Sequence, residues 1–331
     1  MFSCIDRIDF PEDQSESIIV VDGTFSASPG MHKIKLSSSI PVNRQVNEPV
    51  SQAKVFVEDK SGNRIPFFEM KEGSYESQTQ AVVGRTYRLY AELPDGRTIR
   101  SNFQEVPDSF QITEISHKDT LATFLNESGS TQRQKSIEFF AVAKNELIQE
   151  DFHLRFHYET AYQVLETVCS PFHTPKACYF YNDERPFDLN LFEIESQTGA
   201  VSFESLVLRR EIDYTLTEIF GLDLYLYNYN KEEFEYWKQL KQLFDQSGNI
   251  TDAIPARLKG NIVADDGSEV LGQFAVVGKS RKIKLIGNSD FPTNKLPFCG
   301  IAGLRPRPLP DECCDCLGLK GATTIKPDYW P

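Results

Sequence analysis

The sequence lacks any long apolar run, any excess of positive charge and any abundance of helix signals. None of its apolar segments approaches the roughly 18 residues that a membrane-spanning helix needs, so we expect no such helix. Lysine and arginine total 35 against 48 aspartate and glutamate residues, which gives a net charge of −13. Because nucleic acids and anionic lipid surfaces are bound through basic patches, this balance argues against both as partners.

The sequence also has no recognisable catalytic motif, so we predict that the protein is not an enzyme and has no catalytic residues. Two alternatives stay open. The run Asp151–Glu159 places two histidines and a glutamate on one strand face, where they could bind a metal, although Arg155 between them opposes a cation. Cys169 and His173 have the composition of a nucleophile and base, but the sequence gives them no geometry. We predict no metal site and no cofactor.

The 24 phenylalanines and 13 tyrosines, scattered among turn-forming residue pairs, favour a mostly β protein. One helix is predicted at about residues 231–245, where Asn230 provides an N-cap and apolar side chains follow at helical spacing. Just before it, Leu222–Tyr229 is almost continuously apolar, as in a strand that is covered on both faces. We therefore expect this strand and helix to form the centre of the larger domain.

Four segments are expected along the chain. Residues 1–16 form a tether, 17–106 a small β-sandwich, 107–298 a larger antiparallel β domain with the helix, and 299–331 a cysteine-rich tail packed on it. The first domain is predicted to be an immunoglobulin- or prealbumin-like sandwich, and an open barrel is the alternative.

Two turns support these assignments. Asp95-Gly96 is a strong hairpin signal between two strand-like runs. Asp265-Asp266-Gly267 predicts a turn between two later strands, and Gly272 in the second of them marks a bulge or a close backbone approach.

Seven cysteines are present, and their distribution separates one from the other six. Cys4 stands alone near the start of the chain. Structural zinc sites usually consist of two separated CxxC pairs, so disulfides are favoured over zinc for the remainder, provided that the compartment is oxidising. Six cysteines allow 15 pairings, of which we expect Cys169 with Cys178 and two bridges within the tail. The predicted disulfide cysteines are Cys169, Cys178, Cys299, Cys313, Cys314 and Cys316.

Cys4 follows Ser3, as the modified cysteine of a bacterial lipoprotein follows a small residue. Residues 1–6 are too short and have neither the basic start nor the apolar stretch of a signal peptide. The polar, acidic segment from Asp6 to Ser17 reads as a flexible tether. We predict that Cys4 carries a lipid.

Short motifs in a defined order along nearly the whole chain carry a family resemblance. They are Cys4-Ile-Asp, Ile19-Val-Val-Asp-Gly23, Gly84-Arg-Thr-Tyr87, Leu93-Pro-Asp-Gly96, Tyr236-Trp237, Gly260-Asn-Ile262, Val270-Leu-Gly-Gln-Phe274 and the ending Cys313…Cys316…Lys326-Pro-Asp-Tyr-Trp330. In these the chain resembles the Bacteroidota lipoproteins grouped as domain-of-unknown-function family 4249. The resemblance implies an outer-membrane-anchored lipoprotein on the periplasmic or cell-surface side, often encoded beside a TonB-dependent receptor. It also implies no catalytic residues, and it reinforces the disulfide prediction because lipoproteins fold in the oxidising periplasm.

The function predicted is therefore that of a non-enzymatic outer-membrane lipoprotein that acts as accessory or binding partner of a TonB-dependent transporter. Its only membrane contact would be the lipid on Cys4. The alternative is a free-standing carbohydrate- or ligand-binding sandwich that uses Tyr225, Tyr227 or Trp330 as an aromatic platform. A zinc or other metal protein is the third hypothesis.

Overall fold

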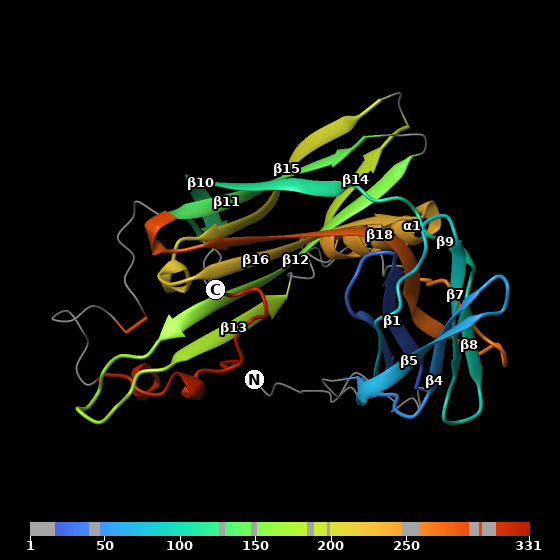
Figure 1. Ribbon diagram of the computed structural model, residues 1–331, viewed down its shortest axis with the longest axis horizontal. Helices are drawn as coiled ribbons and strands as arrows, with labels where there is room; N and C mark the ends of the chain where they lie inside the picture. Colours follow the sequence, from blue (N-terminus) through green and yellow to red (C-terminus); the bar gives the residue numbers. More distant parts are fainter. Residues whose placement is uncertain are drawn as a thin grey trace, which may run out of the picture. The chain divides into compact units, whose positions relative to one another are not determined.

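The computed structural model describes residues 17–39, 47–125, 130–146, 151–183, 189–196, 199–246, 258–290, 298–299 and 309–331 (Figure 1). The predicted tether and lipid-modified Cys4 lie outside these residues. Two compact units are present: Met1–Val106 with Ala256–Val276, and Pro107–Pro255 with Val277–Pro331. Each is mostly β, and the predicted fold class, mostly β with one main helix, is confirmed.

Unit 1 is built from short antiparallel strands. Its hydrogen-bonded order is β18–β1–β2–β6–β5–β4–β7–β8–β17, with β3 beside β2 and β9 beside β7. Buried and less buried positions alternate along β7, so one face of that strand packs on an apolar core that includes Phe25, Leu36 and Leu89. The strands are β1 (Ile19–Ser26), β2 (His32–Ser38), β3 (Glu48–Pro49), β4 (Lys54–Asp59), β5 (Arg64–Lys71), β6 (Ser74–Ser77), β7 (Thr86–Glu92), β8 (Thr98–Ser101), β9 (Gln104–Glu105), β17 (Ile262–Ala264) and β18 (Val270–Ile286).

The hairpin predicted at Asp95-Gly96 joins β7 to β8. The backbone N–H of Leu93 donates to the carbonyl of Arg97 at 2.8 Å, and Gly96 adopts a φ of 92°. A positive φ of this kind favours glycine, which has no Cβ to clash. The turn predicted at Asp95-Gly96 is therefore present and pairs β7 with β8.

The sequence predicts that all of 107–298 belongs to the second domain, and the structure differs from this prediction. Residues 256–276 belong to unit 1, because β17 pairs with β8, as in Ile262 with Ser101. Gly272 has a φ of 82°, and a Cβ there would lie 1.9 Å from the carbonyl oxygen of Val21. The close backbone approach expected at this glycine is thus present, and it holds the returning segment against β1.

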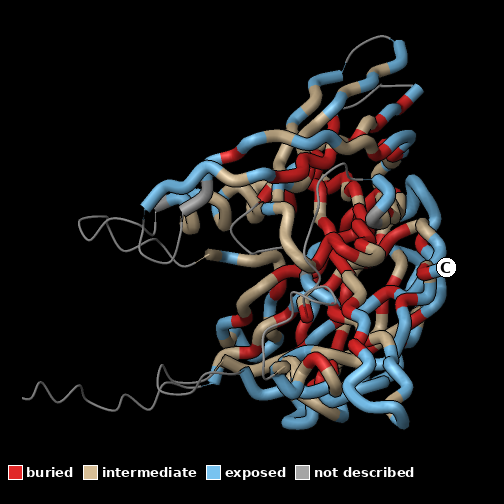
Figure 2. Tube along the Cα trace, turned by 90° about the vertical axis from the view of Figure 1, so that its left-hand side faces the viewer, coloured by how far each residue is buried: buried red, intermediate tan, exposed pale blue. Residues whose placement is uncertain are grey.

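Unit 2 contains two antiparallel sheets. One has the order β13–β12–β16–β18, with β14 also paired to β12, and the other is β10–β11–β15. An apolar core including Phe139, Phe156 and Leu224 lies between them (Figure 2). The strands are β10 (Gln111–Leu125), β11 (Thr131–Asn145), β12 (Phe152–Leu165), β13 (Ala177–Asp183), β14 (Asn190–Ile194), β15 (Val201–Glu211) and β16 (Phe220–Tyr229).

The predicted helix is present as α1, Lys231–Gln246, and it is the single α-helix of the described residues. Its buried Phe234 contacts the ring of His153 on β12 at a centroid distance of 5.3 Å. The guanidinium of Arg155 lies 4.0 Å from the centre of the Trp237 ring. Since His153 and Arg155 point away from the apolar core, α1 covers part of the outer face of the β12–β16 sheet. No helix in the described residues is long and apolar enough to cross a membrane.

Replacing Phe156 by alanine tests the core of unit 2. Phe156 is fully buried, and Phe156→Ala removes a large side chain from a packed interior, which costs about 3–5 kcal/mol of unfolding free energy. Urea unfolding with the disulfides intact measures the loss. Phe172→Ala is the matched control, because Phe172 is 97% exposed, and it is expected to change stability by less than about 0.5 kcal/mol. Equal losses in the two variants would contradict the packing.

Candidate functional site

Three disulfides involve the C-terminal segment 309–331, and two of them join it to residues 169 and 178. They join Cys169 to Cys314, Cys178 to Cys316 and Cys299 to Cys313. The first two join residues 145 and 138 positions apart. The loop-entropy account gives a stabilisation on the order of 4–5 kcal/mol for one such crosslink taken alone, and less for the second once the first has formed.

The six predicted disulfide cysteines are thus all paired, but the predicted pairing is wrong. Cys169 does not bond Cys178, and only Cys299–Cys313 joins two cysteines of the tail. The reason is a non-local approach of the tail to the β12–β13 pair. The N–H of Thr167 donates to the carbonyl of Cys313 at 2.9 Å, and Tyr179 and Thr323 form an antiparallel bridge. Each cysteine near β13 therefore faces a cysteine of the tail.

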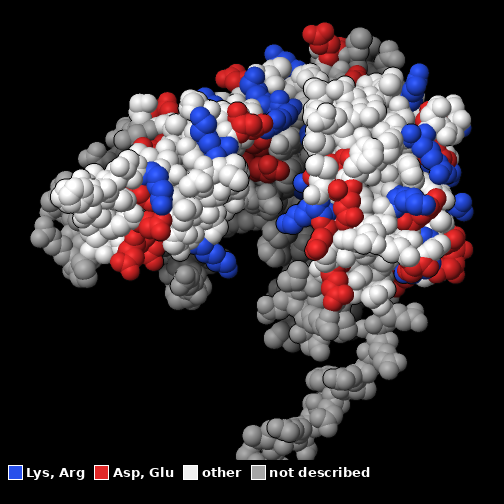
Figure 3. Space-filling view, turned by 60° about the horizontal axis from the view of Figure 1, so that its bottom comes forward, with Lys and Arg blue, Asp and Glu red and all other residues white. Residues whose placement is uncertain are grey.

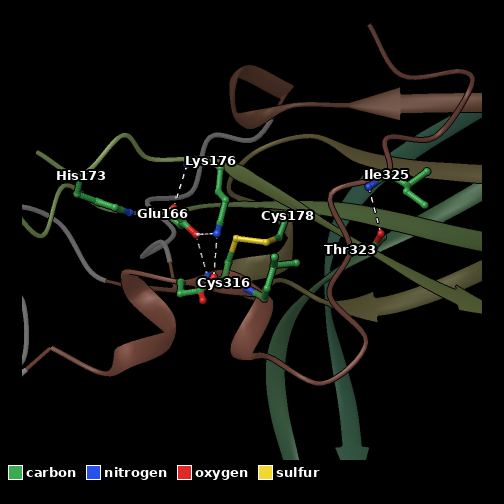
Figure 4. The surroundings of a disulfide bond; sticks show 9 residues. Glu166, His173, Lys176, Cys178, Cys316, Thr323 and Ile325 are labelled. Carbon is green, nitrogen blue, oxygen red and sulfur yellow. Dashed lines mark hydrogen bonds and ion pairs between the residues drawn. A yellow bond between two sulfur atoms is a disulfide. The ribbon is translucent and has the colours of Figure 1, made fainter.

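A buried carboxylate lies beside the Cys178–Cys316 disulfide (Figure 4). The side chain of Glu166 is fully buried, and it accepts hydrogen bonds from the backbone N–H groups of Lys176 and Cys316, both at 3.0 Å. His173 Nε2 lies 3.2 Å and Lys176 Nζ 3.6 Å from its oxygens. Burial alone would raise the pKa of Glu166, but the two hydrogen bonds and the two basic groups together bring it below the ordinary value.

This cluster does not have the chemistry of a metal site or of a nucleophile in the disulfide-bonded protein. The sulfurs of Cys178 and Cys316 lie within 4.8 Å of a Glu166 oxygen and of each other, but they are bonded together and are not thiolates. Cys169, the candidate nucleophile, is bonded to Cys314. Its backbone N–H donates to Nδ1 of His173 at 3.5 Å, so the histidine supports the loop.

The two histidines predicted on one face of β12 lie in different environments. His153 packs on α1, where burial lowers its pKa. His157 stacks on Tyr225 and lies 3.9 Å from Glu159, and this neighbouring imidazole lowers the pKa of Glu159. Arg155 lies between them against Trp237. The structure therefore does not bring the two histidines together around one position.

A pocket of about 270 Å³ opens on the same outer face of the sheet. Strands β12, β13, β16 and β18 form its floor, and the last residues of the chain form one wall. The lining residues are Glu159, Thr160, Tyr181, Asn182, Asp223, Tyr225, Arg281, Lys326, Pro327, Asp328 and Tyr329.

An ion pair between Asp223 and Arg281 lies in the floor of this pocket. Asp223, on the apolar strand β16, is 2% exposed. Arg281 donates from Nε and Nη2 to its two carboxylate oxygens at 2.8 and 2.6 Å, and Tyr225 Oη donates to the second oxygen at 2.9 Å. This bidentate geometry fixes the plane of the guanidinium. Asp223 raises the pKa of Arg281, and burial followed by the charge of Asp223 raises that of Tyr225.

The tail wall is held by close packing and hydrogen bonds. A Cβ at Gly221 would lie 2.9 Å from the Trp330 ring and 3.0 Å from the Tyr329 ring, so this glycine lets the tail approach the sheet. Trp330 Nε1 donates to Oε1 of Gln163 at 3.3 Å. Tyr181 Oη donates to the carbonyl of Ile325 at 2.9 Å. The wall of the pocket therefore belongs to the same segment that the disulfides attach to residues 169 and 178.

Most of the residues that line this pocket are not predicted from the sequence as binding residues. Of the predicted aromatic platform, Tyr225 lines it but uses its hydroxyl on Asp223, and Trp330 is only 6% exposed. Tyr181 and Tyr329, which do line it, were not singled out. One signal was available: Asp223 is the lone charge in an otherwise apolar strand, and such a charge needs a partner.

Comparison with known proteins gives the family. A family model described as "Domain of unknown function (DUF4249)" matches residues 5–283. The chain belongs to the DUF4249 family. Glu159, Asp223 and Arg281 lie within the DUF4249 match, whereas the tail cysteines and Tyr329 follow it.

Similarity to other proteins is slight. No curated protein matches this DUF4249 chain in sequence. A two-domain fibronectin type III segment from chicken tenascin is 11% identical, with a TM-score of 0.17, and the match covers 64% of this chain and 91% of that one. A structure of carbohydrate-binding modules from the β-sandwich superfamily is 9% identical, with a TM-score of 0.17, and the match covers 61% and 100%. At these TM-scores neither likeness supports an argument about function.

Glu166→Gln tests the buried carboxylate beside the disulfide. The variant removes a charge that receives two backbone hydrogen bonds, and we expect a loss of about 1.5–3 kcal/mol at pH 7. The folded-state pKa lies below the unfolded value of about 4.3, so wild-type stability from this group is present above that value and is lost as pH falls through the folded pKa. The difference between the proteins is therefore expected to shrink below about pH 4.

Urea unfolding at pH 7 and at acid pH, without reductant, measures both effects. Glu204→Gln is the control, because Glu204 is exposed, and we expect a change of less than about 0.5 kcal/mol. A Glu166→Gln protein as stable as wild type at pH 7 would show that the carboxylate does not stabilise the tail.

Proposed function

We propose that this DUF4249 protein is a non-enzymatic binding protein of the bacterial cell envelope. It is anchored to the outer membrane by a lipid on Cys4 and serves as accessory or binding partner of a TonB-dependent transporter. The observation that carries the proposal is the set of three disulfides, two of which join the tail to Cys178 on β13 and to Cys169 in the segment between β12 and β13. Structural disulfides form and persist in oxidising compartments such as the periplasm and the cell surface.

A binding role, rather than a catalytic one, is supported by the state of the charged groups in the pocket. Both oxygens of Asp223 accept from Arg281, and one also accepts from Tyr225. A carboxylate engaged in this way orients its neighbours and is poorly placed to take a proton from a ligand. Such a pre-organised set of polar groups around a cavity is typical of a recognition site.

The lipid anchor and the transporter rest on sequence. Ser3-Cys4 resembles the end of a lipoprotein signal, and the acidic segment that follows is suited to a tether. The proposed transporter partner comes from the resemblance to the Bacteroidota lipoproteins. The net charge of −13 disfavours direct binding to an anionic membrane surface, which is consistent with contact through the lipid alone.

The test is the intact mass of the protein purified from its native membranes, before and after reduction. We expect a mass excess from acyl chains on the peptide that contains Cys4. Reduction should add six hydrogens, two for each of the three disulfides, and none on the Cys4 peptide. Cross-linking before solubilisation should recover a TonB-dependent receptor.

Cys4→Ser is the control, and it should release the protein from the membrane fraction while keeping all three disulfides. An unmodified Cys4 in the native protein would contradict the anchor. Six free thiols would contradict the proposed oxidising compartment. A lipidated protein that cross-links to no receptor would contradict the partner alone.

A further inference from the structure

We propose that the pocket between β12, β13, β16, β18 and the tail binds the ring of a neutral sugar. This deepens the proposed binding function and rests on it, but it does not depend on the lipid or on the transporter. Three properties of the pocket support a sugar ligand, namely the mixed charge of its lining, its aromatic side chains and its size.

The charges of the lining are mixed in sign. Glu159 and Asp328 contribute carboxylates to the lining. Lys326, whose Nζ also donates to the carbonyl of Pro331 at 3.0 Å, and Arg281 contribute donors. Arg281 is already paired to Asp223, so it acts mainly as a fixed set of hydrogen-bond donors. Figure 3 shows acidic and basic side chains interspersed on the face that it displays. An anion or a cation would meet repulsion from one of the two sets, whereas hydroxyl groups can donate to the carboxylates and accept from the cations.

Two tyrosine rings provide apolar surface beside these polar groups. Tyr181 is 49% exposed, and its hydroxyl is held by the carbonyl of Ile325 at 2.9 Å, so the ring has a fixed position. Tyr329 is half-buried against the sheet and also lines the pocket. A pyranose ring has C–H groups on its faces and hydroxyls on its rim, which matches an aromatic face bordered by donors and acceptors.

The volume favours a small ligand. About 270 Å³ lies just below the usual range of about 300–1,000 Å³ for small-molecule sites. One sugar ring, or the end of a short oligosaccharide, suits this size. The tail forms a wall of the pocket, so a ring bound there would touch both the sheet and the disulfide-linked segment.

The experiment uses the full chain with Cys4→Ser, so that the protein is purified without lipid. Glucose, galactose, mannose and N-acetylglucosamine are titrated at millimolar concentrations and followed by ligand-observed NMR. We expect at least one of these to bind, and Tyr181→Ala to weaken its binding by about tenfold or more. Tyr181→Phe keeps the ring and loses the hydrogen bond that fixes it to Ile325, so its binding should fall by less than that of Tyr181→Ala.

Phe172→Ala is the second control, because it removes an exposed aromatic ring outside the pocket. Glycine, lysine and inorganic phosphate are the competing probes. Binding of none of the sugars, equal sugar binding by the Tyr181→Ala protein, or preferential binding of an amino acid or phosphate would each overturn the inference. These outcomes would leave the lipid and receptor results untouched, so failure here is distinguishable from failure of the proposed function.

Discussion

The covalent attachment of the tail to Cys178 on β13 and to Cys169 in the preceding segment is the constraint on which the docked tail, the buried carboxylate and one wall of the pocket depend. Residues 309–331 bury few large apolar side chains, among them Trp330. Ordering a backbone segment costs conformational entropy for every residue, and so few contacts would not hold a tail of this composition in place. Disulfides to Cys169 and Cys178 reduce that cost by restricting the unfolded chain. The tail can then contribute structure that its own sequence would not maintain.

Attachment of the tail also makes a buried charge tolerable. Glu166 has no exposed side-chain surface, and an isolated carboxylate in such a position would be very unfavourable. One of its hydrogen-bond donors is the backbone N–H of Cys316, a residue that the bond to Cys178 holds beside it. Disulfide and carboxylate therefore stabilise the same docked conformation from two sides, one by covalent restriction and one by electrostatics.

Local features of the sequence were sufficient for the elements whose causes are local. The helix Lys231–Gln246 begins directly after Asn230, where the sequence predicts it, and carries apolar residues at helical spacing. The β7–β8 hairpin follows from Asp95-Gly96. The disulfide pairing failed because it is a long-range property. Cys169 and Cys178 are close in sequence, yet their partners lie 145 and 138 residues away. These partners are brought close by the docking of the tail on β13, which the local sequence does not predict.

The pocket was missed for the same physical reason. Asp223, Arg281 and Tyr329 come from three distant parts of the chain, and the register of β16 against β18 decides that Arg281 lies opposite Tyr225 and within reach of Asp223. A lone aspartate in an apolar strand indicates that a partner must exist, but it does not say which residue that partner is.

The two halves of the pocket are positioned by different means. The Asp223–Arg281 pair lies within the sheet, where strand pairing holds it irrespective of cysteine oxidation. Tyr329 and Asp328 follow the Cys178–Cys316 bridge and the Tyr179–Thr323 pairing. Reduction would leave the floor of the pocket and remove the covalent support of its wall. The complete pocket therefore belongs to the oxidised protein, and the compartment in which the disulfides form is also the one in which the site is fully assembled.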